Sequence, residues 1–489
     1  MRQVFIRELS YYSPTELSDK LKVPLESAKV LIEVLTTRGV LKLKSTNDVE
    51  EYDSYIDASP ANRGKYQFVY VGIAKFNDIV LVVYPKYFGA HEPTIAQMRQ
   101  IFRVIRKASG SLSEIAAATE DGLSQNDKLA LMLTILEMYS EYSLYSNQQK
   151  VYETNGYGDV SWEQTISTHD AFLNKGKPLY LDFETTKTTQ NQSDFVTRFH
   201  EFAVTECSRF MNESGLAELL ALDEVELTDS EIEDFGDKEY IKYRLEQELG
   251  IQFVTWKQDL IKLLLQYIEE DEVSIQSDGV MCLGITSFYH TWEIACKIAF
   301  DDMLDRPLER LPITLPERWT KRKQETLLSI IPRPAWYVFD KVHGYTTYAT
   351  KDTLVPDTVT IWGDNGGKQT FAILDAKYYT PQLGRRVTGV PGIESITKQH
   401  LYQSAYRDFV KDCAIEHVVN AFVVPSNCED MRLLGKVEFS EVLEILPTPF
   451  TNEILLWALP AEQIWNCYLE NRTLEEDEVN HIIGEHNER

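Results

Sequence analysis

The chain has 489 residues, of which 43% are hydrophobic and 11% aromatic, so it is long enough for about three domains with ordinary buried cores. Its 49 Lys and Arg residues face 76 Asp and Glu residues, a formal charge of -27 that disfavours tight binding of nucleic acid by the chain alone. No apolar run reaches the roughly 18 residues that span a membrane, and the N-terminus lacks the apolar core of a secretory signal. We therefore expect a cytoplasmic protein with no membrane partner.

The first 62 residues have the pattern of a winged helix-turn-helix. Ser13 can cap a helix, Pro14 suits its first position, and Glu16 completes a capping box. A second helical pattern follows after a short turn, and residues 40–44 have the composition of a strand that enters a wing. The second helix of such a domain often enters the DNA major groove, but this one carries only two basic residues. Binding of DNA and docking of another protein therefore both remain open.

The middle of the chain has no catalytic pattern. Residues 63–150 begin with a β-hairpin around Asn77-Asp78, because both flanking runs are rich in β-branched and aromatic residues, and helices follow. Residues 151–275 are predicted to form a mainly helical connecting region. The acidic excess lies outside residues 331–440, which hold 12 basic and 12 acidic residues.

Residues 276–489 have the element order of an α/β core with a small mixed sheet. A helix over residues 287–304 precedes a proline-rich connection, and a hairpin, a helix and a strand follow. The whole chain is therefore predicted to be an α+β or α/β multidomain protein. The cysteines are scattered without a C-x-x-C pair, which argues against a zinc knuckle and against a disulfide framework.

The strongest chemical signal is a pair of β-rich runs around a glycine-rich turn. The first run begins Pro356-Asp357 and the second ends Asp375-Ala376-Lys377. Pairing around the turn brings the start of one strand beside the end of the other. Asp375 and Lys377 are two positions apart, so their side chains leave the same face of the strand. We predict that the two aspartates and the lysine converge.

Two carboxylates and a lysine in this arrangement suit the hydrolysis of a phosphodiester. Hard oxygen ligands hold Mg²⁺, which keeps several waters and binds phosphate oxygens. Such a metal polarises the phosphate and lowers the pKa of a bound water. Lys377 can orient or deprotonate that water, or neutralise charge in the transition state. The competing interpretation is a surface salt bridge between Asp375 and Lys377 on an edge strand.

The helix before the hairpin adds a third carboxylate. Glu293 lies on a largely apolar face, where a carboxylate is costly unless it is paired or binds metal. We therefore predict Glu293 as a metal ligand together with Asp357 and Asp375. The alternative is a glutamate at the boundary of the helix that reaches solvent or pairs with Lys297.

The helix after the hairpin adds two glutamines. Gln399 and Gln403 lie one turn apart on one face of a helix predicted over residues 397–409. A glutamine that faces the site can hydrogen-bond the DNA backbone or a metal-bound water; the alternative is that both are ordinary exposed residues. His400 and His417 have no His or Cys partner at ligand spacing, so structural roles are expected. The sequence contains no H-E-x-x-H, Walker A or G-x-S-x-G motif.

These residues resemble the PD-(D/E)xK nuclease superfamily, and more narrowly the LlaJI and McrC restriction subunits. A Pro-Lys pair at the end of the early hairpin, in V-V-Y-P-K-Y, is also similar to McrC proteins. Four motifs carry the resemblance: W-E at 292–293, P-D at 356–357, I-L-D-A-K at 373–377 and L-Y-Q at 401–403. The resemblance implies a Mg²⁺-dependent endonuclease for double-stranded DNA, in which Mn²⁺ can replace Mg²⁺. It gives catalytic roles to Glu293, Asp357, Asp375, Lys377, Gln399 and Gln403.

The resemblance also implies a partner. McrC-type subunits act with a separate AAA+ GTPase of the McrB type, in an oligomeric assembly, and residues 63–150 and the acidic middle region would then dock that partner. Three alternatives remain from the sequence: a catalytically silent adaptor of an AAA+ protein, a winged-helix transcription regulator, and a nuclease of the transposase type. The intact Asp357, Asp375 and Lys377 set argues against the first, and the large nuclease-like half argues against the second.

Overall fold

The computed structural model describes residues 2–44, 64–108, 128–190, 194–276, 280–341, 343–363, 369–385, 387–439, 449–475 and 478–479. The chain divides into two compact units. The helical unit comprises Lys75–Asp78 and Asn126–Leu283, and the sheet unit comprises Arg2–Ala74, Ile79–Gln125 and Gly284–Arg489. The fold is mixed α/β and multidomain, while the boundaries of the four predicted domains stay predictions. No helix within the described ranges is long and apolar enough to cross a membrane.

A small helix pair and a three-stranded sheet open the sheet unit. Ser13 Oγ accepts from Glu16 N at 3.2 Å and Glu16 Oε2 accepts from Ser13 N at 2.7 Å, which confirms the predicted capping box. The sheet order is β2-β4-β3, and the wing expected after residue 44 falls on residues outside the described ranges. The elements are β2 (Tyr11–Tyr12), α1 (Pro14–Leu21), α2 (Leu25–Thr37), β3 (Leu41–Leu43) and β4 (Tyr66–Phe68).

The predicted early hairpin is confirmed as β5 (Val71–Phe76) and β6 (Ile79–Tyr84), which are neighbours in one sheet. Asn77 has φ 48°, the left-handed conformation that tight hairpin turns require. The first strand of the chain, β1 (Arg2–Arg7), pairs with β6 in parallel. A 3-10 turn, η2 (Lys86–Phe88), and α3 (Ile95–Ala108) follow.

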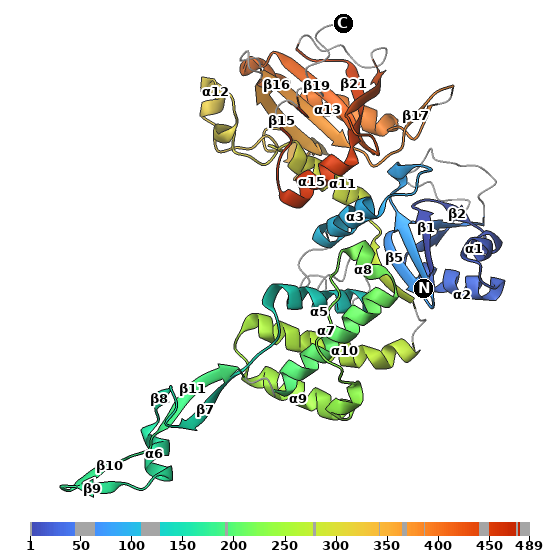
Figure 1. Ribbon diagram of the computed structural model, residues 1–489. Helices are drawn as coiled ribbons and strands as arrows, with labels where there is room; N and C mark the ends of the chain where they lie inside the picture. The colour runs from blue at the N-terminus through green and yellow to red at the C-terminus, as the bar shows by residue number, and fades with distance from the viewer. Residues whose placement is uncertain are drawn as a thin grey trace. The chain divides into compact units, whose positions relative to one another are not determined.

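The helical unit contains packed helices and a β-rich extension. Its helices α5 (Lys128–Tyr142), α7 (Phe195–Glu213), α9 (Lys238–Ile251) and α10 (Thr255–Gln276) pack against one another, and their apolar stripes form its core. The extension, between α5 and α7, is mostly stranded, whereas the rest of residues 151–275 is mainly helical, as the sequence predicted (Figure 1). It consists of β7 (Gln148–Thr154), β8 (Asp159–Val160), α6 (Trp162–Thr168), β9 (Phe172–Asn174), β10 (Lys177–Leu179) and β11 (Glu184–Gln190).

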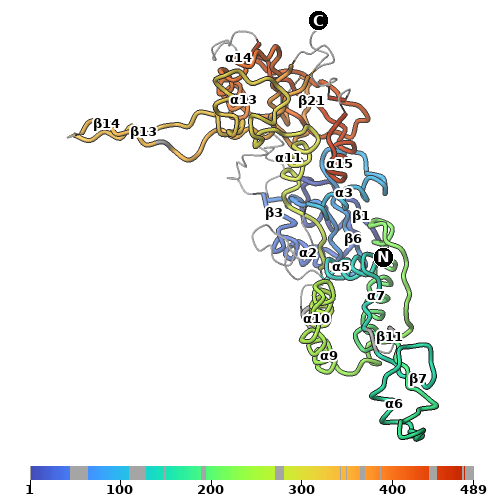
Figure 2. Tube along the Cα trace, turned by 90° about the vertical axis from the view of Figure 1, so that its left-hand side faces the viewer, coloured from blue at the N-terminus to red at the C-terminus, as the bar shows by residue number. Residues whose placement is uncertain are grey.

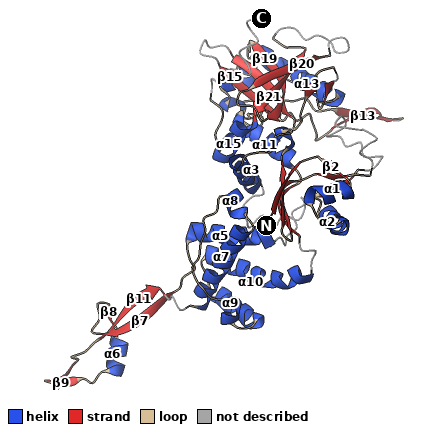
Figure 3. Ribbon diagram, turned by 45° about the vertical axis from the view of Figure 1, so that its right-hand side comes forward, coloured by secondary structure: helices blue, strands red, loops and turns tan. Residues whose placement is uncertain are grey.

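A five-stranded mixed sheet forms the C-terminal part of the sheet unit (Figures 1 and 3). The antiparallel pair of β15 and β16 confirms the predicted hairpin, whose turn over residues 364–368 lies outside the described residues. β16, β19 and β21 run parallel, so their C-terminal ends share one edge of the sheet. In spatial order the strands are β15 (Thr358–Gly363), β16 (Gln369–Ala376), β19 (His417–Ser426), β21 (Glu453–Pro460) and β20 (Arg432–Glu438).

Helices cover both faces of this sheet because side chains alternate along each strand. Phe371 and Ile373 of β16 belong to a core with Tyr406 and Phe409, from the segment of α13 (Ile393–Ala405) and α14 (Arg407–Asp412). Two further helices, α11 (Phe288–Ala299) and α15 (Ala461–Glu470), pack together, and the ring centroids of Trp292 and Trp465 are 5.4 Å apart.

The structure corrects three details of the sequence prediction. The helix expected over residues 287–304 ends at Ala299, because Asp301 adopts a left-handed φ of 54°. The helix expected over 397–409 begins earlier and breaks at Tyr406 into α13 and α14. The proline-rich connection leads into an unpredicted hairpin of β13 (Ala335–Asp340) and β14 (Gly344–Ala349), which projects from the sheet unit in Figure 2.

Candidate active site

The C-terminal end of β16 brings Asp375 and Lys377 together. Lys377 N donates to Val423 O at 2.9 Å, which continues the parallel pairing with β19 past the last residue of β16. The two side chains leave the same face, and Lys377 Nζ lies 2.9 Å from Asp375 Oδ2. Both are largely enclosed, with Asp375 only 6% exposed. An edge-strand surface salt bridge, the competing interpretation, does not describe a pair on a strand with neighbours on both sides.

Asp357 faces this pair from the adjacent strand. It directly precedes β15, and the antiparallel register, which pairs Thr358 with Leu374, places Asp357 opposite Asp375 when continued by one residue. Asp357 Oδ2 accepts a hydrogen bond from Ala376 N at 3.1 Å. The backbone of β16 thus fixes the Asp357 carboxylate next to that of Asp375, as the hairpin pattern predicts.

The charges of the three groups interact strongly. Burial and the neighbouring Asp357 carboxylate raise the pKa of Asp375, and Lys377 only partly offsets them. For Lys377, burial lowers the pKa, but Asp375 and Asp357 outweigh burial and the pKa is raised overall. The site therefore holds excess negative charge in a poorly solvated place, which one lysine does not neutralise. Strong interactions between ionisable groups in an enclosed site are typical of functional centres.

Glu293 lies near this cluster but is tied to another partner. It is on α11, and His290 Nδ1 lies 3.1 Å from Glu293 Oε2. Burial raises the pKa of Glu293, and the Asp357 carboxylate raises it further, so the two carboxylates interact. The predicted alternative, an ion pair with Lys297, is not formed among the described contacts; His290 takes that place.

The two candidate glutamines are both buried, so the alternative interpretation, that they are ordinary exposed residues, is wrong for both. Gln403 Nε2 donates to Thr451 O at 2.7 Å, and Gln403 Oε1 accepts from Thr451 N at 3.3 Å. The Gln403 amide therefore holds the backbone before β21, and the structure does not direct it to the carboxylates. The side-chain amide of Gln399 has no hydrogen-bond partner among the described residues, although it is fully buried. An unsatisfied buried amide is costly, so Gln399 has hydrogen-bonding capacity for a water or ligand.

One residue beside the site escaped the sequence analysis. Tyr402 Oη donates to Val355 O at 3.0 Å, which ties α13 to the segment that leads into Asp357. Burial raises the pKa of Tyr402 to about 12, and the charges of Asp375 and Asp357 contribute to the increase. Tyr402 lies within the L-Y-Q motif, in which the polar amide of Gln403 is the predicted candidate for binding DNA or a metal-bound water. The signal that could have found it was its i,i+3 relation to Gln399, which puts both residues on one helix face.

A buried contact links the segment of the candidate residue Lys377 to the end of the early hairpin. Tyr378, next to Lys377, donates its hydroxyl to Glu8 Oε2 at 2.7 Å, and Lys86 N donates to the same oxygen at 3.0 Å. Lys86 Nζ lies 4.8 Å from the Tyr378 ring centroid. Tyr87, the residue after the Pro-Lys pair, accepts a hydrogen bond from Trp465 Nε1 at 3.0 Å. This end of the hairpin is enclosed, so a docking partner would have to use other surfaces.

The donor set fits a hard divalent cation with an incomplete protein shell. Within the described residues, no group of three or more His, Cys, Asp and Glu side chains is placed to hold a metal ion, so the predicted trio of Asp357, Asp375 and Glu293 is not preassembled. Mg²⁺ is commonly bound through one or two carboxylates, with waters and substrate phosphates as its other ligands. Asp357 and Asp375 meet that requirement, and their excess negative charge favours a cation there.

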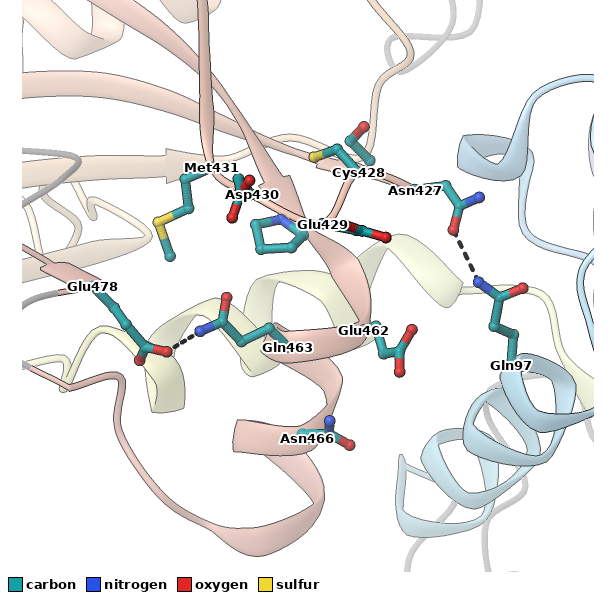
Figure 4. A pocket seen from close by; sticks show the side chains of 12 residues that line it. Gln97, Asn427, Cys428, Glu429, Asp430, Met431, Glu462, Gln463, Asn466 and Glu478 are labelled. Carbon is teal, nitrogen blue, oxygen red and sulfur yellow. Dashed lines mark hydrogen bonds between the residues drawn. The ribbon is translucent and has the colours of Figure 1, made fainter.

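A pocket of about 1100 Å³ lies elsewhere in the sheet unit, where β19 and β21 end and α15 begins (Figure 4). Its carboxylates belong to Glu429, Asp430, Glu462 and Glu478, and its lining contains no Lys or Arg. Gln97 Nε2 donates to Asn427 Oδ1 at 3.1 Å at its edge. None of the predicted site residues lines this pocket, and its charge disfavours a phosphate backbone.

Comparison with known proteins gives a consistent family. The family model described as LlaJI restriction endonuclease matches residues 70–451. A curated relative, the "Type II restriction enzyme BsuMI component YdjA" of Bacillus subtilis (strain 168), is 25% identical over 438 residues, which cover 87% of this chain and 85% of the relative.

Two solved structures are also similar to this chain, at low scores. One is a refined half-complex from a tetradecameric assembly of Thermococcus gammatolerans McrB AAA+ hexamers with bound McrC, at 13% identity and a TM-score of 0.39; it covers 99% of this chain and all of that chain. The other is a cryo-EM structure of the Thermococcus gammatolerans McrBC complex, at 14% identity and a TM-score of 0.24, covering 56% and 88%. Scores of this size do not establish a shared fold. The family match, in contrast, spans most of the chain, and the protein belongs to the LlaJI restriction endonuclease family.

Proposed function

We propose that this chain is the DNA-cleaving subunit of a multi-subunit restriction enzyme, and that it hydrolyses phosphodiester bonds of double-stranded DNA at Asp357, Asp375 and Lys377. The observation that carries the proposal is the opposed pair of carboxylates, Asp357 and Asp375, with Lys377 held 2.9 Å from Asp375. Membership of a restriction endonuclease family supports this assignment of the reaction. It also argues against the transposase-type and regulator alternatives.

Asp357 and Asp375 would hold Mg²⁺, or Mn²⁺, which takes similar oxygen ligands. The bound metal would polarise the scissile phosphate and lower the pKa of a coordinated water. Lys377, whose Nζ lies 2.9 Å from Asp375 Oδ2, would serve as a fixed cation beside the metal ligands. Its ammonium group would neutralise charge that develops on the phosphate. Glu293 would act from beside Asp357 through a metal-bound water, and the fully buried Gln399 would act through an enclosed water.

We also propose that cleavage depends on an AAA+ GTPase of the McrB type. The chain carries no Walker A motif, so a nucleotide-driven step must come from another protein. Its charge of -27 repels DNA overall, and the segment 331–440 around the site is only neutral. The relative in Bacillus subtilis is named as one component of its restriction enzyme, which is consistent with an enzyme made of several subunits. The adaptor alternative, in which the site is silent, is separated from this proposal by the cleavage test.

The test is plasmid cleavage in Mg²⁺ by the full chain alone, with its AAA+ partner, and with the partner and GTP. We expect almost no cutting by the isolated chain and efficient cutting by the complete mixture. Asp375→Asn should abolish cutting in the complete mixture, whereas Asp352→Asn, a matched change at an exposed aspartate, should leave it intact. Residual nicking by the Asp375→Asn protein would refute the site. Fast cutting by the chain alone, without nucleotide, would refute the dependence on a partner.

A further inference from the structure

The hairpin of β13 and β14 exposes apolar side chains on both of its faces. The register pairs Trp336 with Tyr348 and Phe339 with Tyr345, so successive pairs alternate between the two faces. One face carries Trp336, Val338 and Tyr348, and the other carries Tyr337, Phe339 and Tyr345; each of these side chains is 53–70% exposed. Figure 2 shows the hairpin extending away from the rest of the sheet unit. Exposed apolar side chains in such a concentration mark an interaction site.

The root of the hairpin is firmly held, so the hairpin has a defined place near the candidate active site. Thr350 N donates to Pro334 O at 3.0 Å, and Thr353 Oγ1 donates to Pro332 O at 3.0 Å. Asp357 follows Ala349 by eight positions in the sequence. Eight extended residues span at most roughly 29 Å, so the base of the hairpin at Ala349 lies within that distance of Asp357.

The charge of this segment is opposite to that of the chain. Residues 333–351 contain three basic residues, Arg333, Lys341 and Lys351, and one acidic residue, Asp340. Asp340 is engaged in the turn, where its Oδ1 accepts from His343 N at 2.9 Å. The whole chain has 49 basic and 76 acidic residues, so a locally basic segment with interspersed aromatic residues stands out. That combination is suited to a nucleic acid.

The exposure of apolar side chains on both faces of the hairpin indicates which kind of partner it binds. A flat protein surface covers one face of a hairpin and leaves the other in water. The major groove of B-form DNA is about 12 Å wide, admits a two-stranded β-ribbon and offers contacts to both of its faces. Six residues per strand at roughly 3.4 Å each give an arm of about 20 Å, long enough to follow a groove over several base pairs.

We propose that the β13–β14 hairpin is a DNA-binding arm that inserts into the major groove of duplex DNA beside the nuclease site. Trp336 and Tyr345 anchor it from opposite faces, while Lys341 and Lys351 contact phosphates. The inference rests on the proposed function and deepens it, because it assigns to this chain a contact with its substrate despite the overall charge of -27.

The experiment measures the affinity of the full chain for a labelled mixed-sequence duplex, by fluorescence anisotropy over a range of low salt concentrations. The arm variant combines Trp336→Ser and Tyr345→Ser. The control variant combines Tyr157→Ser and Trp162→Ser, which removes exposed aromatic residues from the helical unit. We expect the arm variant to bind at least about tenfold more weakly, with an unchanged salt slope, since truncated aromatic anchors lose contact and no charge. The control should bind like the wild type.

A second variant tests the charges separately. Lys341→Gln with Lys351→Gln should lower the slope of log K against log salt by roughly 2, because each phosphate contact contributes about 0.9. Equal affinity of the arm variant and the wild type would overturn the inference. If the arm variant binds DNA like the wild type but has a different mass in light scattering, the arm contacts a second copy of the chain. If it binds DNA like the wild type but is no longer stimulated by the AAA+ partner, the arm contacts that partner. Either result would overturn the inference.

Parallel cleavage assays with the partner and GTP separate this inference from the proposed function. If Asp375→Asn abolishes cutting while the arm variant binds and cuts like the wild type, the proposed function stands and the arm is refuted. If the wild-type mixture does not cut DNA, the proposed function is refuted. If the wild-type chain does not bind the duplex even at the lowest salt, the arm is refuted irrespective of cleavage.

Discussion

Removal of one buried charge from the candidate site should make the metal-free protein more stable. Asp375 is buried and lies beside the Asp357 carboxylate, so its ionised form is disfavoured in the folded state. Asp375→Asn keeps the size of the side chain and removes the charge. In EDTA, we expect this variant to unfold at a higher temperature than the wild type, and we expect it not to cleave DNA. A gain in stability on loss of function is typical of residues placed for chemistry.

The size of the gain follows from the linkage between protonation and folding. Burial and Asp357 raise the pKa of Asp375 from 3.8 to about 7, and each pKa unit corresponds to 1.36 kcal/mol, so the upper limit at pH 8 is about 4 kcal/mol. This limit already includes the attraction of Lys377, which partly offsets burial and the Asp357 charge. For a region of about 200 residues, it corresponds to a rise in Tm of at most roughly 8–16 °C.

The pH dependence has a definite sign. The folded-state pKa of Asp375 lies above the unfolded value, so the unfolded chain releases its proton first as the pH rises. The penalty is absent below about pH 4, grows between pH 4 and 7, and is complete above pH 7. The difference in Tm between Asp375→Asn and the wild type should therefore be large at pH 8 and small at pH 4.5.

Thermal unfolding of the full chain, followed by calorimetry in EDTA and then in Mg²⁺, provides the assay. Mg²⁺ should raise the Tm of the wild type and leave that of Asp375→Asn nearly unchanged, because ligand binding stabilises only the state that binds it. Asp352→Asn is the control and should behave like the wild type in both conditions. A lower Tm for Asp375→Asn in EDTA, or an equal response of both proteins to Mg²⁺, would refute the reasoning.

Three further changes test other contacts. Tyr378→Phe removes a 2.7 Å hydrogen bond to Glu8 and should lower the free energy of unfolding by about 2 kcal/mol in denaturant. The same substitution should cost less in a protein that already carries Glu8→Gln, and equal losses in the two proteins would mean that the residues are not coupled. Gln403→Ala should cost about 1–3 kcal/mol of stability while the folded protein still cuts DNA, and a loss of cleavage as complete as that of Asp375→Asn would return Gln403 to the catalytic set. Burial lowers the pKa of His200 to about 4, so the unfolded chain takes up the proton first as the pH falls, and the free energy of unfolding should fall by about 2 kcal/mol between pH 7 and pH 5. Calorimetry of His200→Gln at the two pH values should show no such fall. If the fall persists in this variant, another group causes it.

The sequence was most informative where local rules decide the structure. The capping box at Ser13 and the turn at Asn77 were both predictable, because each depends on the preferences of two or three neighbouring residues. The convergence of Asp357 and Asp375 followed from a single hairpin register. These features needed no knowledge of which elements pack together across the chain.

Long-range packing was not predictable from the same patterns. The contact of Tyr378 with Glu8 joins residues 370 positions apart, and no periodicity in either segment indicates it. Gln403 and Gln399 share a helix face, yet one is occupied by the backbone of Thr451 and the other has no partner among the described residues. The difference arises because a distant segment, at Thr451, packs beside Gln403 and supplies its hydrogen-bond partner, and a pattern within one helix does not predict such a contact.

The distribution of charge gives a reason for dividing the reaction between subunits. Asp357 and Asp375 repel phosphate when no cation is bound, and the chain outside residues 331–440 is strongly acidic, so random encounters with DNA are disfavoured. The basic aromatic arm is short, and three cations release few counterions, so its phosphate contacts contribute little affinity at physiological salt. Under the proposed function, such a subunit would cut only where another protein has delivered the DNA and a metal completes the site. Weak binding of DNA by the isolated chain and an enclosed candidate cleavage site are therefore compatible with one mechanism.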